Sequence, residues 1–247
     1  MDTAGPLTIG QLRRLIDQAE NDGARRTRLF ADNWMPRAHV VNGLTDQVLE
    51  FALSEWQRLQ GASVLDYGCG TLPYRTIFEL AGASVVAADI GDNPQSHLHL
   101  TCDGKLPSAE HSFDYVVSFQ VLEHVPEPGI YLHEAYRVLK PGGKLFLTTH
   151  GIWPFHPTPG DFHRWTRSGL ILALETTGFR IIKTGQVLNE YAALLQAMVM
   201  NASYRGRLGM FSQLIHAIAN ICILVINKFD KDAKELPSVL SAIGEKY

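Results

Sequence analysis

The sequence predicts an α/β fold built on a doubly wound, mostly parallel sheet of seven strands. Short runs of β-branched and apolar residues alternate with helical segments, a pattern typical of strands that helices cover on both faces. The clearest of these runs occupy residues 64–66, 84–89, 113–118 and 143–149. Helices between successive strands imply right-handed crossovers and parallel pairing. The glycine pair Gly68 and Gly70 follows the first run and indicates a turn from that strand into a helix.

Two helices are expected before the first strand. Apolar residues recur at helical spacing from residue 8 to about residue 30, and Thr8 is available as the N-cap. A second helix is expected over residues 44–59. The other expected helices are 76–81, 128–139 and 168–176, and the short strands still to be placed are 97–101 and 179–183.

The last part of the chain is expected to add to the sheet. Residues 189–237 form a mostly helical, apolar insertion in this prediction, and residues 238–243 return as a final edge strand beside the strand at 179–183. We therefore predict one compact domain. Its three parts are an N-terminal helical cover over residues 1–60, a ligand-binding core over 61–188, and a helical cap with the edge strand over 189–247.

Composition narrows the classes of protein and of partner. The chain has 46% hydrophobic and 19% charged residues and a net charge of −3, which gives it no general attraction for polyanions, so nucleic acid is not an expected partner. Three scattered cysteines favour a reducing compartment over a disulfide framework. The first 18 residues lack the apolar core of a signal peptide, so we expect a cytoplasmic protein.

Several polar residues follow directly after predicted strands. In an open parallel sheet the ligand lies beyond the carboxyl ends of the strands, so these residues are the first candidates for binding. Asp89 ends the second strand about twenty residues after the glycines, where an acid characteristically binds two ribose hydroxyls. Asp103 and Gly104 end the third strand, and Gln120 follows the fourth. This order indicates a ligand that contains a ribose and an adenine.

The glycine turn also bears on the class of ligand. Dinucleotide enzymes share this fold and its first acid, but their fingerprint has a third glycine where the pyrophosphate meets the helix N-terminus. Here that position is Pro73, which has no N–H to donate to a phosphate. A ligand without phosphates therefore fits the turn better than a nicotinamide dinucleotide does.

An ordered set of motifs resembles the class I S-adenosylmethionine-dependent methyltransferases, specifically the type 11 group. The motifs are LDYGCGT at residues 65–71, DI at 89–90, LP at 106–107, SFD at 112–114, QVLEHV at 120–125 and RVLKPGG at 137–143. The resemblance runs from about residue 64 to residue 183. It implies a Rossmann-like fold, S-adenosyl-L-methionine as cofactor and methyl transfer to a small molecule.

The resemblance also implies roles for particular residues. The glycine turn would hold the methionine part, Asp89 the ribose, Asp103 with Gly104 the adenine, and Gln120 would line the side of the methyl donor. Ile90 follows the second-strand acid, where the family often sandwiches the adenine. The full set of predicted cofactor-binding residues is Tyr67, Gly68, Cys69, Gly70, Asp89, Ile90, Asp103, Gly104 and Gln120.

The stretch 150–166 should lie over the methyl group. It contains three histidines, an aspartate, an arginine and two tryptophans, which supply a base, a charge clamp and aromatic walls. The residues that we single out as catalytic candidates are His150, His156, Asp161, His163 and Arg164. In our hypothesis His150 or His156 takes a proton from a hydroxyl acceptor, and Asp161 orients a histidine or the substrate.

The same stretch allows other interpretations. Arg164 either pairs with a substrate carboxylate or phosphate, or pairs with Asp161. Asp161, His163 and Arg164 could instead only hold the loop in place, and His156, Asp161 and His163 could form a two-histidine, one-carboxylate metal set. We predict no metal.

The favoured function is O-methylation of a sugar or another small hydroxylated molecule by a monomer or homodimer. One alternative is a non-catalytic binding protein that keeps the cofactor fold. A second is a methyltransferase that docks on a membrane and acts on a lipid-linked glycan, because residues 191–200 and 211–225 are more apolar than the sheet requires.

Overall fold

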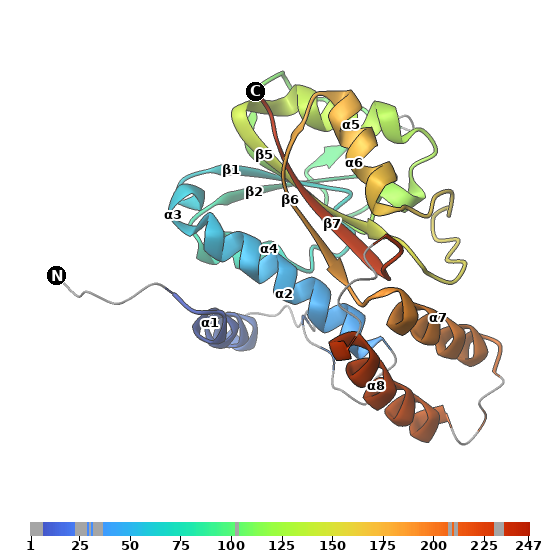
Figure 1. The fold of residues 1–247 in the computed structure, drawn as a ribbon. Coiled ribbons are helices and arrows are strands. Elements are labelled where there is room, and N and C mark those ends of the chain that lie inside the picture. The colour runs from blue at the N-terminus through green and yellow to red at the C-terminus, as the bar shows by residue number, and fades with distance from the viewer. Residues whose placement is uncertain are drawn as a thin grey trace.

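The fold is known from a computed structural model that describes residues 7–22, 29, 31, 37–101, 104–206, 209, 212–229 and 235–247. Within these residues it confirms the predicted α/β fold, with seven strands in the order β3-β2-β1-β4-β5-β7-β6 (Figure 1). The strands are β1 (Ser63–Tyr67), β2 (Ser84–Asp89), β3 (Leu98–His99), β4 (Phe113–Phe119), β5 (Leu139–His150), β6 (Arg180–Val187) and β7 (Val239–Glu245). All pairings are parallel except those of β7, which runs antiparallel to β5 and β6.

Helices cover both faces of the sheet (Figure 1). They are α1 (Ile9–Asp22), α2 (Ala38–Ser54), α3 (Trp56–Leu59), α4 (Arg75–Leu80), α5 (Pro128–Val138), α6 (Arg167–Thr177), α7 (Glu190–Tyr204) and α8 (Ser212–Phe229). The helices α1 to α4 share a core with alternate residues of β1 such as Val64, whereas α5 and α6 share the opposite core with Leu65. Successive residues of one strand are therefore buried on opposite faces, as the continuous apolar runs predict.

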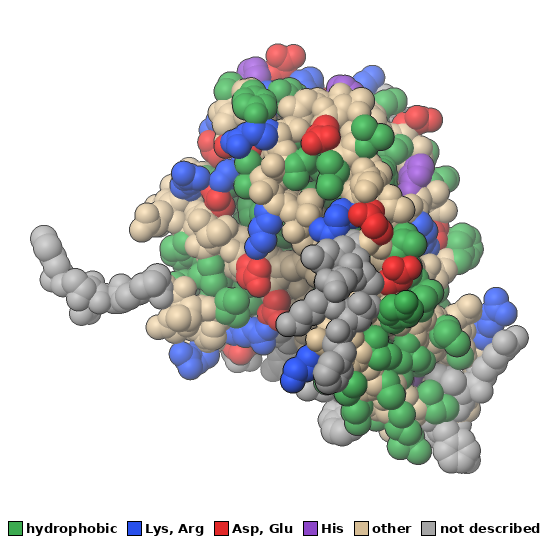
Figure 2. All heavy atoms as spheres, viewed as in Figure 1, with side chains coloured by type: hydrophobic (Ala, Val, Ile, Leu, Met, Phe, Trp, Pro, Cys, Tyr) green, Lys and Arg blue, Asp and Glu red, His purple; other side chains and the backbone are tan. Residues whose placement is uncertain are grey.

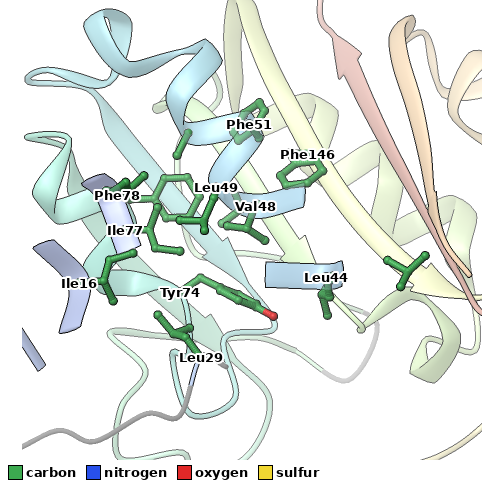
Figure 3. Close-up of a cluster of buried hydrophobic side chains, with 14 of the residues drawn as sticks. Ile16, Leu29, Leu44, Val48, Leu49, Phe51, Tyr74, Ile77, Phe78 and Phe146 are labelled. Atoms are coloured by element: carbon green, nitrogen blue, oxygen red, sulfur yellow. The ribbon is translucent and has the colours of Figure 1, made fainter. Parts of the chain in front are cut away.

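The core under α2 fixes that helix against the centre of the sheet. The ring centroids of Phe51 on α2 and Phe146 on β5 lie 4.6 Å apart, and Val48 and Leu49 are fully buried beside them (Figure 3). Burial of each such side chain contributes about 1.5–3 kcal/mol. This packing holds the strands whose ends carry the pocket described below.

Helix α2 begins at Ala38, ahead of the predicted start at residue 44. Gly43 lies inside this helix and close to β6, because a Cβ at Gly43 would meet Cγ1 of Val187 at 2.6 Å. A glycine inside a helix normally weakens it. Here the glycine instead lets the helix pack on the sheet.

The final strand corrects one of our predictions. We expected residues 238–243 to form an edge strand, but β7 lies between β5 and β6, with Val239 opposite both His150 and Val187. Val239, Leu240 and Ala242 are buried, as an interior strand requires. The edge is β6, where Arg180, Ile182 and Lys183 are exposed, and the two charged residues suit an unpaired edge.

The insertion between β6 and β7 is a hairpin of α7 and α8. Asn189 joins its two ends: its side-chain oxygen accepts from the N–H of Ala192 at 2.9 Å, and its amide donates to the carbonyl oxygen of Ile226 at 3.2 Å. Because β6 is parallel to β5, α7 starts at the same edge of the sheet as the loop after β5. None of the helices in the described part of the chain reaches the length and hydropathy of a bilayer-spanning helix.

Gly151 should be essential for the start of the loop after β5. Its N–H donates to the carbonyl oxygen of Ser238 at 2.9 Å, and a Cβ there would collide with the carbonyl oxygen of Pro237. We expect Gly151→Ala to lower the Tm by roughly 5 °C or more, since neither backbone can yield cheaply. Thermal denaturation followed by circular dichroism measures this change.

Gly129→Ala is the matched control. Gly129 lies in the first turn of α5, and a Cβ added there would meet no atom within 4 Å, so alanine should leave the Tm unchanged or raise it slightly. Equal Tm values for Gly151→Ala and the parent protein would contradict the packing described here.

Candidate functional site

A pocket of about 540 Å³ opens where the carboxyl ends of the parallel strands meet. The turns after β1, β2 and β4 and the loop after β5 contribute to it. Of the residues predicted to bind the cofactor, it is lined by Gly68, Gly70, Asp89, Ile90, Gly104 and Gln120. Tyr67 and Cys69 are buried outside this lining, and Asp103 lies outside the described residues.

The turn between β1 and α4 forms the floor of the pocket. Gly68 adopts a φ of +82°, and its N–H and that of Cys69 donate to the carbonyl oxygen of Ala88 at 2.9 and 3.0 Å. A Cβ at Gly68 would lie 2.6 Å from Cγ2 of Val121, whereas a Cβ at Gly70 would meet nothing within 4 Å. The turn is therefore packed tightly against Val121 at Gly68 and has open space at Gly70, as a backbone cradle for a ligand requires.

Asp89 joins the end of β2 to this turn. Its Oδ2 accepts from the N–H of Gly70 at 3.0 Å and from Nδ2 of Asn93 at 2.6 Å, and its Oδ1 accepts from the N–H of Ile90 at 2.8 Å. Asn93 also donates to the carbonyl oxygen of Gly70 at 2.8 Å. Asn93, which the sequence did not lead us to expect here, ties the acid and the turn into one unit; its place four residues after the acid is the only signal that could have revealed it.

A second carboxylate lies beneath the turn. Asp66 is buried in β1, and burial, together with the nearby charge of Asp89, raises its pKa to about 7. Cys69 lies close by, and burial with the charges of Asp66 and Asp89 raises the pKa of its thiol to about 12. The thiol is therefore unreactive, and the floor of the pocket is a region that favours positive charge.

The side of the pocket predicted to hold adenine is supported by a pair of tyrosines. Tyr67 is fully buried and stacks on Tyr131, with ring centroids 3.9 Å apart, and its hydroxyl donates to the carbonyl oxygen of Gly104. Gly104 has a φ of +83° and lines the pocket together with Ile90, which is 46% exposed. Tyr67 thus supports the wall through Gly104, and Ile90 offers an apolar surface to a flat ring.

Gln120 follows directly after the end of β4 and lines the pocket. It has a φ of +58°, its N–H donates to the carbonyl oxygen of Thr148 at 3.0 Å, and its Nε2 donates to Oγ1 of Thr148 at 2.9 Å. A left-handed conformation at a residue other than glycine is strained and often marks a functional position. Its bonds to β5 hold the side chain at the pocket between the cofactor side and the loop after β5.

Of the five catalytic candidates, His156 lines the pocket. His124, the histidine of the QVLEHV motif, lines it too, and the two rings lie 5.6 Å apart. The Nδ1 of His124 contacts the carbonyl oxygen of Gly160, and because a carbonyl oxygen only accepts, Nδ1 is the donor there. Partial burial, with His124 and His150 nearby, lowers the pKa of His156 below its ordinary value of 6.5. His156 is therefore neutral at pH 7 and able to accept a proton.

Asp161 and Arg164 hold the loop together. Both oxygens of Asp161 contact the guanidinium of Arg164, and Oδ2 also accepts from the N–H of His156 at 2.8 Å. Arg164 in turn donates to the carbonyl oxygens of Trp153 and Pro154 at 3.1 and 3.0 Å. These contacts favour the prediction in which Arg164 pairs with Asp161, and together the two residues fix the position of His156.

His150 lies deeper than His156 and faces Glu123. Its Nδ1 is 2.7 Å from Oε1 of Glu123, and its ring stacks on Trp153 with centroids 4.4 Å apart. Burial alone would raise the pKa of Glu123, but His150 and the hydroxyl of Thr149 hold that pKa below its usual value. The carbonyl oxygen of Glu123 accepts from the N–H groups of Phe162 and His163, so this buried acid anchors the loop at both ends.

The possible metal set is not assembled in the part of the chain that the structure describes. There, no three side chains of His, Cys, Asp or Glu are grouped to hold an ion. Asp161 is engaged with Arg164, and Nε2 of His163 lies 3.4 Å from the carbonyl oxygen of Pro126. Asp161 is thus bound to Arg164 and to the backbone N–H of His156, while the ring of His163 faces a carbonyl oxygen.

Comparisons with known proteins agree on one family. A family described as a methyltransferase domain matches residues 37–184. The ubiquinone biosynthesis O-methyltransferase of Azotobacter vinelandii is 32% identical over 154 residues, which are 54% of this chain and 63% of that relative. The chain thus matches less than two thirds of the relative's length.

Solved structures share the fold at low sequence identity. An S-adenosylmethionine-dependent methyltransferase from Mesorhizobium loti has a TM-score of 0.53 and 17% identity, covering 82% of this chain and 98% of that one. The (4+2)-cyclase SpnF has a TM-score of 0.56 and 17% identity, covering 95% and 92% of the two chains. At these identities the likeness concerns the fold alone.

The raised pKa of Asp66 should make the free protein less stable as the pH rises. The folded chain binds this proton more tightly than the unfolded chain, whose pKa is 3.8, so stability is lost between about pH 4 and pH 7. Asp66→Asn is neutral at every pH and should be more stable than the parent above pH 7, by up to about 4 kcal/mol. Thermal denaturation without ligand, from pH 4 to pH 8, measures the difference.

At pH 4 the difference between the parent and Asp66→Asn should shrink to less than about 1 kcal/mol, because Asp66 is then neutral in the folded chain and only partly ionised in the unfolded chain. A stability difference that stays constant from pH 4 to pH 8 would contradict the assigned pKa. Asp92→Asn, three residues beyond Asp89 on the exposed surface, is the control and should show no such pH-dependent gain.

Proposed function

Because the chain belongs to the methyltransferase domain family, we propose that it transfers a methyl group from S-adenosyl-L-methionine to a hydroxyl oxygen of a small acceptor. The family match over residues 37–184 confirms the recognition of a class I S-adenosylmethionine-dependent methyltransferase. The proposal goes further in the nucleophile and the acceptor. The observation that carries it is His156, a neutral histidine that lines the same pocket as the glycine turn.

The residues on the sheet side fit the proposed cofactor. Asp89 presents a carboxylate to the pocket at the point where a ribose would lie, and Gly70 leaves open space beside it. Ile90 and Gly104 would hold the adenine between an apolar side chain and a glycine backbone. Beneath the turn, the pair Asp66 and Asp89 favours a ligand with positive charge, and S-adenosylmethionine carries such charge.

S-adenosylmethionine supplies a methyl group on a sulfonium, which needs an aligned nucleophile more than it needs activation. The chain's part is to position the acceptor and keep water out, and orientation of this kind contributes roughly 7–11 kcal/mol. A hydroxyl also has to lose its proton. In the proposal His156 accepts that proton, which adds about 10²- to 10⁴-fold.

The other loop residues would act through position. Asp161 bonds to the backbone of His156 and to Arg164, and Arg164 bonds to the backbone at Trp153 and Pro154. In the proposal His150, which contacts Glu123, anchors the loop, and His156 is the base. Support for oxygen as the nucleophile comes from the O-methyltransferase relative, which is similar over 54% of this chain.

The direct test is production of S-adenosylhomocysteine. Purified protein is incubated with S-adenosylmethionine and a panel of sugars, nucleotide sugars and phenols, and product is measured by mass spectrometry. Acceptor-dependent S-adenosylhomocysteine with the methyl group on oxygen supports the proposal. The cyclase SpnF has a similar fold, so the fold alone does not establish methyl transfer. Binding of S-adenosylmethionine without methyl transfer to any acceptor would favour a different reaction or a binding role.

His156→Ala should lower kcat by at least about 100-fold with an acceptor found in this panel, because it removes the proposed base. Cofactor affinity should stay unchanged. The lowered pKa of His156 also predicts that the acid limb of the kcat–pH profile lies below pH 6.5. Steady-state kinetics from pH 5 to pH 9 measure both effects.

His133→Ala is the control, because His133 lies exposed on α5 with its Nδ1 2.7 Å from the carbonyl oxygen of Gly129. It should keep full turnover. A His156→Ala enzyme with full kcat at saturating acceptor would show that His156 is not the base. An acid limb above pH 6.5 in the kcat–pH profile of the parent enzyme would show the same.

A further inference from the structure

Helix α8 carries polar side chains on its buried face and large apolar side chains on its exposed face. His216 and Asn220 are 3% and 5% exposed and lie on its inner face with Ala219. The large apolar side chains instead point outward. Leu214, Ile218, Ile221, Leu224 and Val225 are each between 50% and 60% exposed. A helix in contact with water normally shows the reverse arrangement.

The outer surface of α7 continues the same pattern. Tyr191, Leu194 and Met198 recur at helical spacing and are 62%, 45% and 70% exposed, while Gln196 on the inner side is buried. Figure 2 shows these hydrophobic side chains gathered over α7 and α8, at the lower right of the view. We call these eight apolar residues, five on α8 and three on α7, the hairpin face. Contiguous apolar surface of this kind marks a docking site.

The hairpin carries more basic than acidic residues. From Glu190, where α7 begins, to residue 229 the sequence has three basic residues, Arg205, Arg207 and Lys228, and one acidic residue, Glu190, although the whole chain has a net charge of −3. Arg205 and Lys228 are exposed, whereas Glu190 is half-buried. An apolar helical surface with an excess of basic residues is complementary to an anionic lipid surface.

A second copy of the chain suits this surface less well. In a symmetric pair the hairpin face would meet itself, and its basic residues would approach one another with Glu190 as the single carboxylate of each hairpin to pair with them. Phospholipid head groups supply negative charge, and the acyl boundary takes up the apolar side chains.

The hairpin lies at the edge of the sheet that carries the pocket. Val239 pairs with His150 on one side and with Val187 on the other, so α7 and the loop after β5 leave the sheet two strands apart in the same direction. The loop exposes Phe155 and Phe162 at 73% and 55%. A surface that binds the hairpin face is therefore on the pocket's side of the molecule.

We propose that the hairpin face docks this protein on anionic lipid bilayers, with the apolar side chains of α7 and α8 at the lipid interface and Arg205 and Lys228 at the head groups. The inner polar residues of α8 stay packed against α7 and the body of the protein. The docking leaves the fold intact, since the face already points away from the core.

Flotation of the full chain with vesicles tests this proposal. The protein should float with phosphatidylcholine vesicles that contain phosphatidylglycerol, less with pure phosphatidylcholine, and less again in high salt. Ile221→Asp and Ile218→Asp should each weaken vesicle partitioning by roughly tenfold or more, because each removes a side chain buried at the interface. Arg205→Glu should weaken it at least about fivefold for phosphatidylglycerol vesicles.

Leu172→Asp is the matched control, an equally drastic change at a 65% exposed leucine on α6, on the other helical layer. It should float like the parent protein. The Tm and the affinity for S-adenosylmethionine should be unchanged in all four variants, which shows that the effect comes from the surface. This readout is independent of methyl transfer and stands even if the proposed reaction fails.

Three results would overturn the proposal. The first is a parent protein that stays in solution with phosphatidylglycerol vesicles. The second is a Leu172→Asp variant that loses flotation as Ile221→Asp does. The third is a dimer in light scattering that Ile221→Asp dissociates, because the hairpin face would then be an interface between two copies.

Discussion

The hydrogen bond from the N–H of Gly70 to the carboxylate of Asp89 is the contact on which the site depends. It joins the turn after β1 to the end of β2, and Asn93 closes the same unit by donating to both. The strands themselves are adjacent and parallel, with Tyr67 opposite Ala88, so the sheet brings the two ends together before any ligand binds. The acid therefore has backbone and side-chain partners within this unit, and it also lines the pocket.

The opposite wall is held by quite different means. The loop after β5 has no regular secondary structure for most of its length, yet it is fixed by the carbonyl oxygen of Glu123 and by the pair of Asp161 and Arg164. A cradle made by the sheet thus faces a loop that side-chain and backbone contacts hold in place.

The fold could be predicted well because its signals are local. Apolar runs mark β2 at Ser84–Asp89 as predicted, and the order of motifs places Asp89 and the glycines at one edge. The place of β7 could not be predicted in the same way. An apolar run indicates that a strand is buried, but its neighbours depend on where the α7–α8 hairpin returns the chain.

The candidate site was predictable to a similar degree. Glycines and an acid at strand ends follow a general rule, and Gly68, Gly70 and Asp89 line the pocket, while their part in cofactor binding stays a prediction. The pairing of His150 with Glu123 joins residues far apart in the sequence and has no periodic signal, so the sequence could not show that this candidate base is buried against a carboxylate. His124 lines the pocket from a three-residue helix that propensity does not reveal.

Calorimetric titration of S-adenosylmethionine into Asp89→Ala tests the central claim most directly, with Asp92→Ala as a neighbouring exposed control. Removing the carboxylate that is proposed to receive the ribose hydroxyls should weaken binding roughly 100-fold or more, while Asp92→Ala should bind like the parent protein. Equal affinity for the parent and for a folded Asp89→Ala variant would contradict the account.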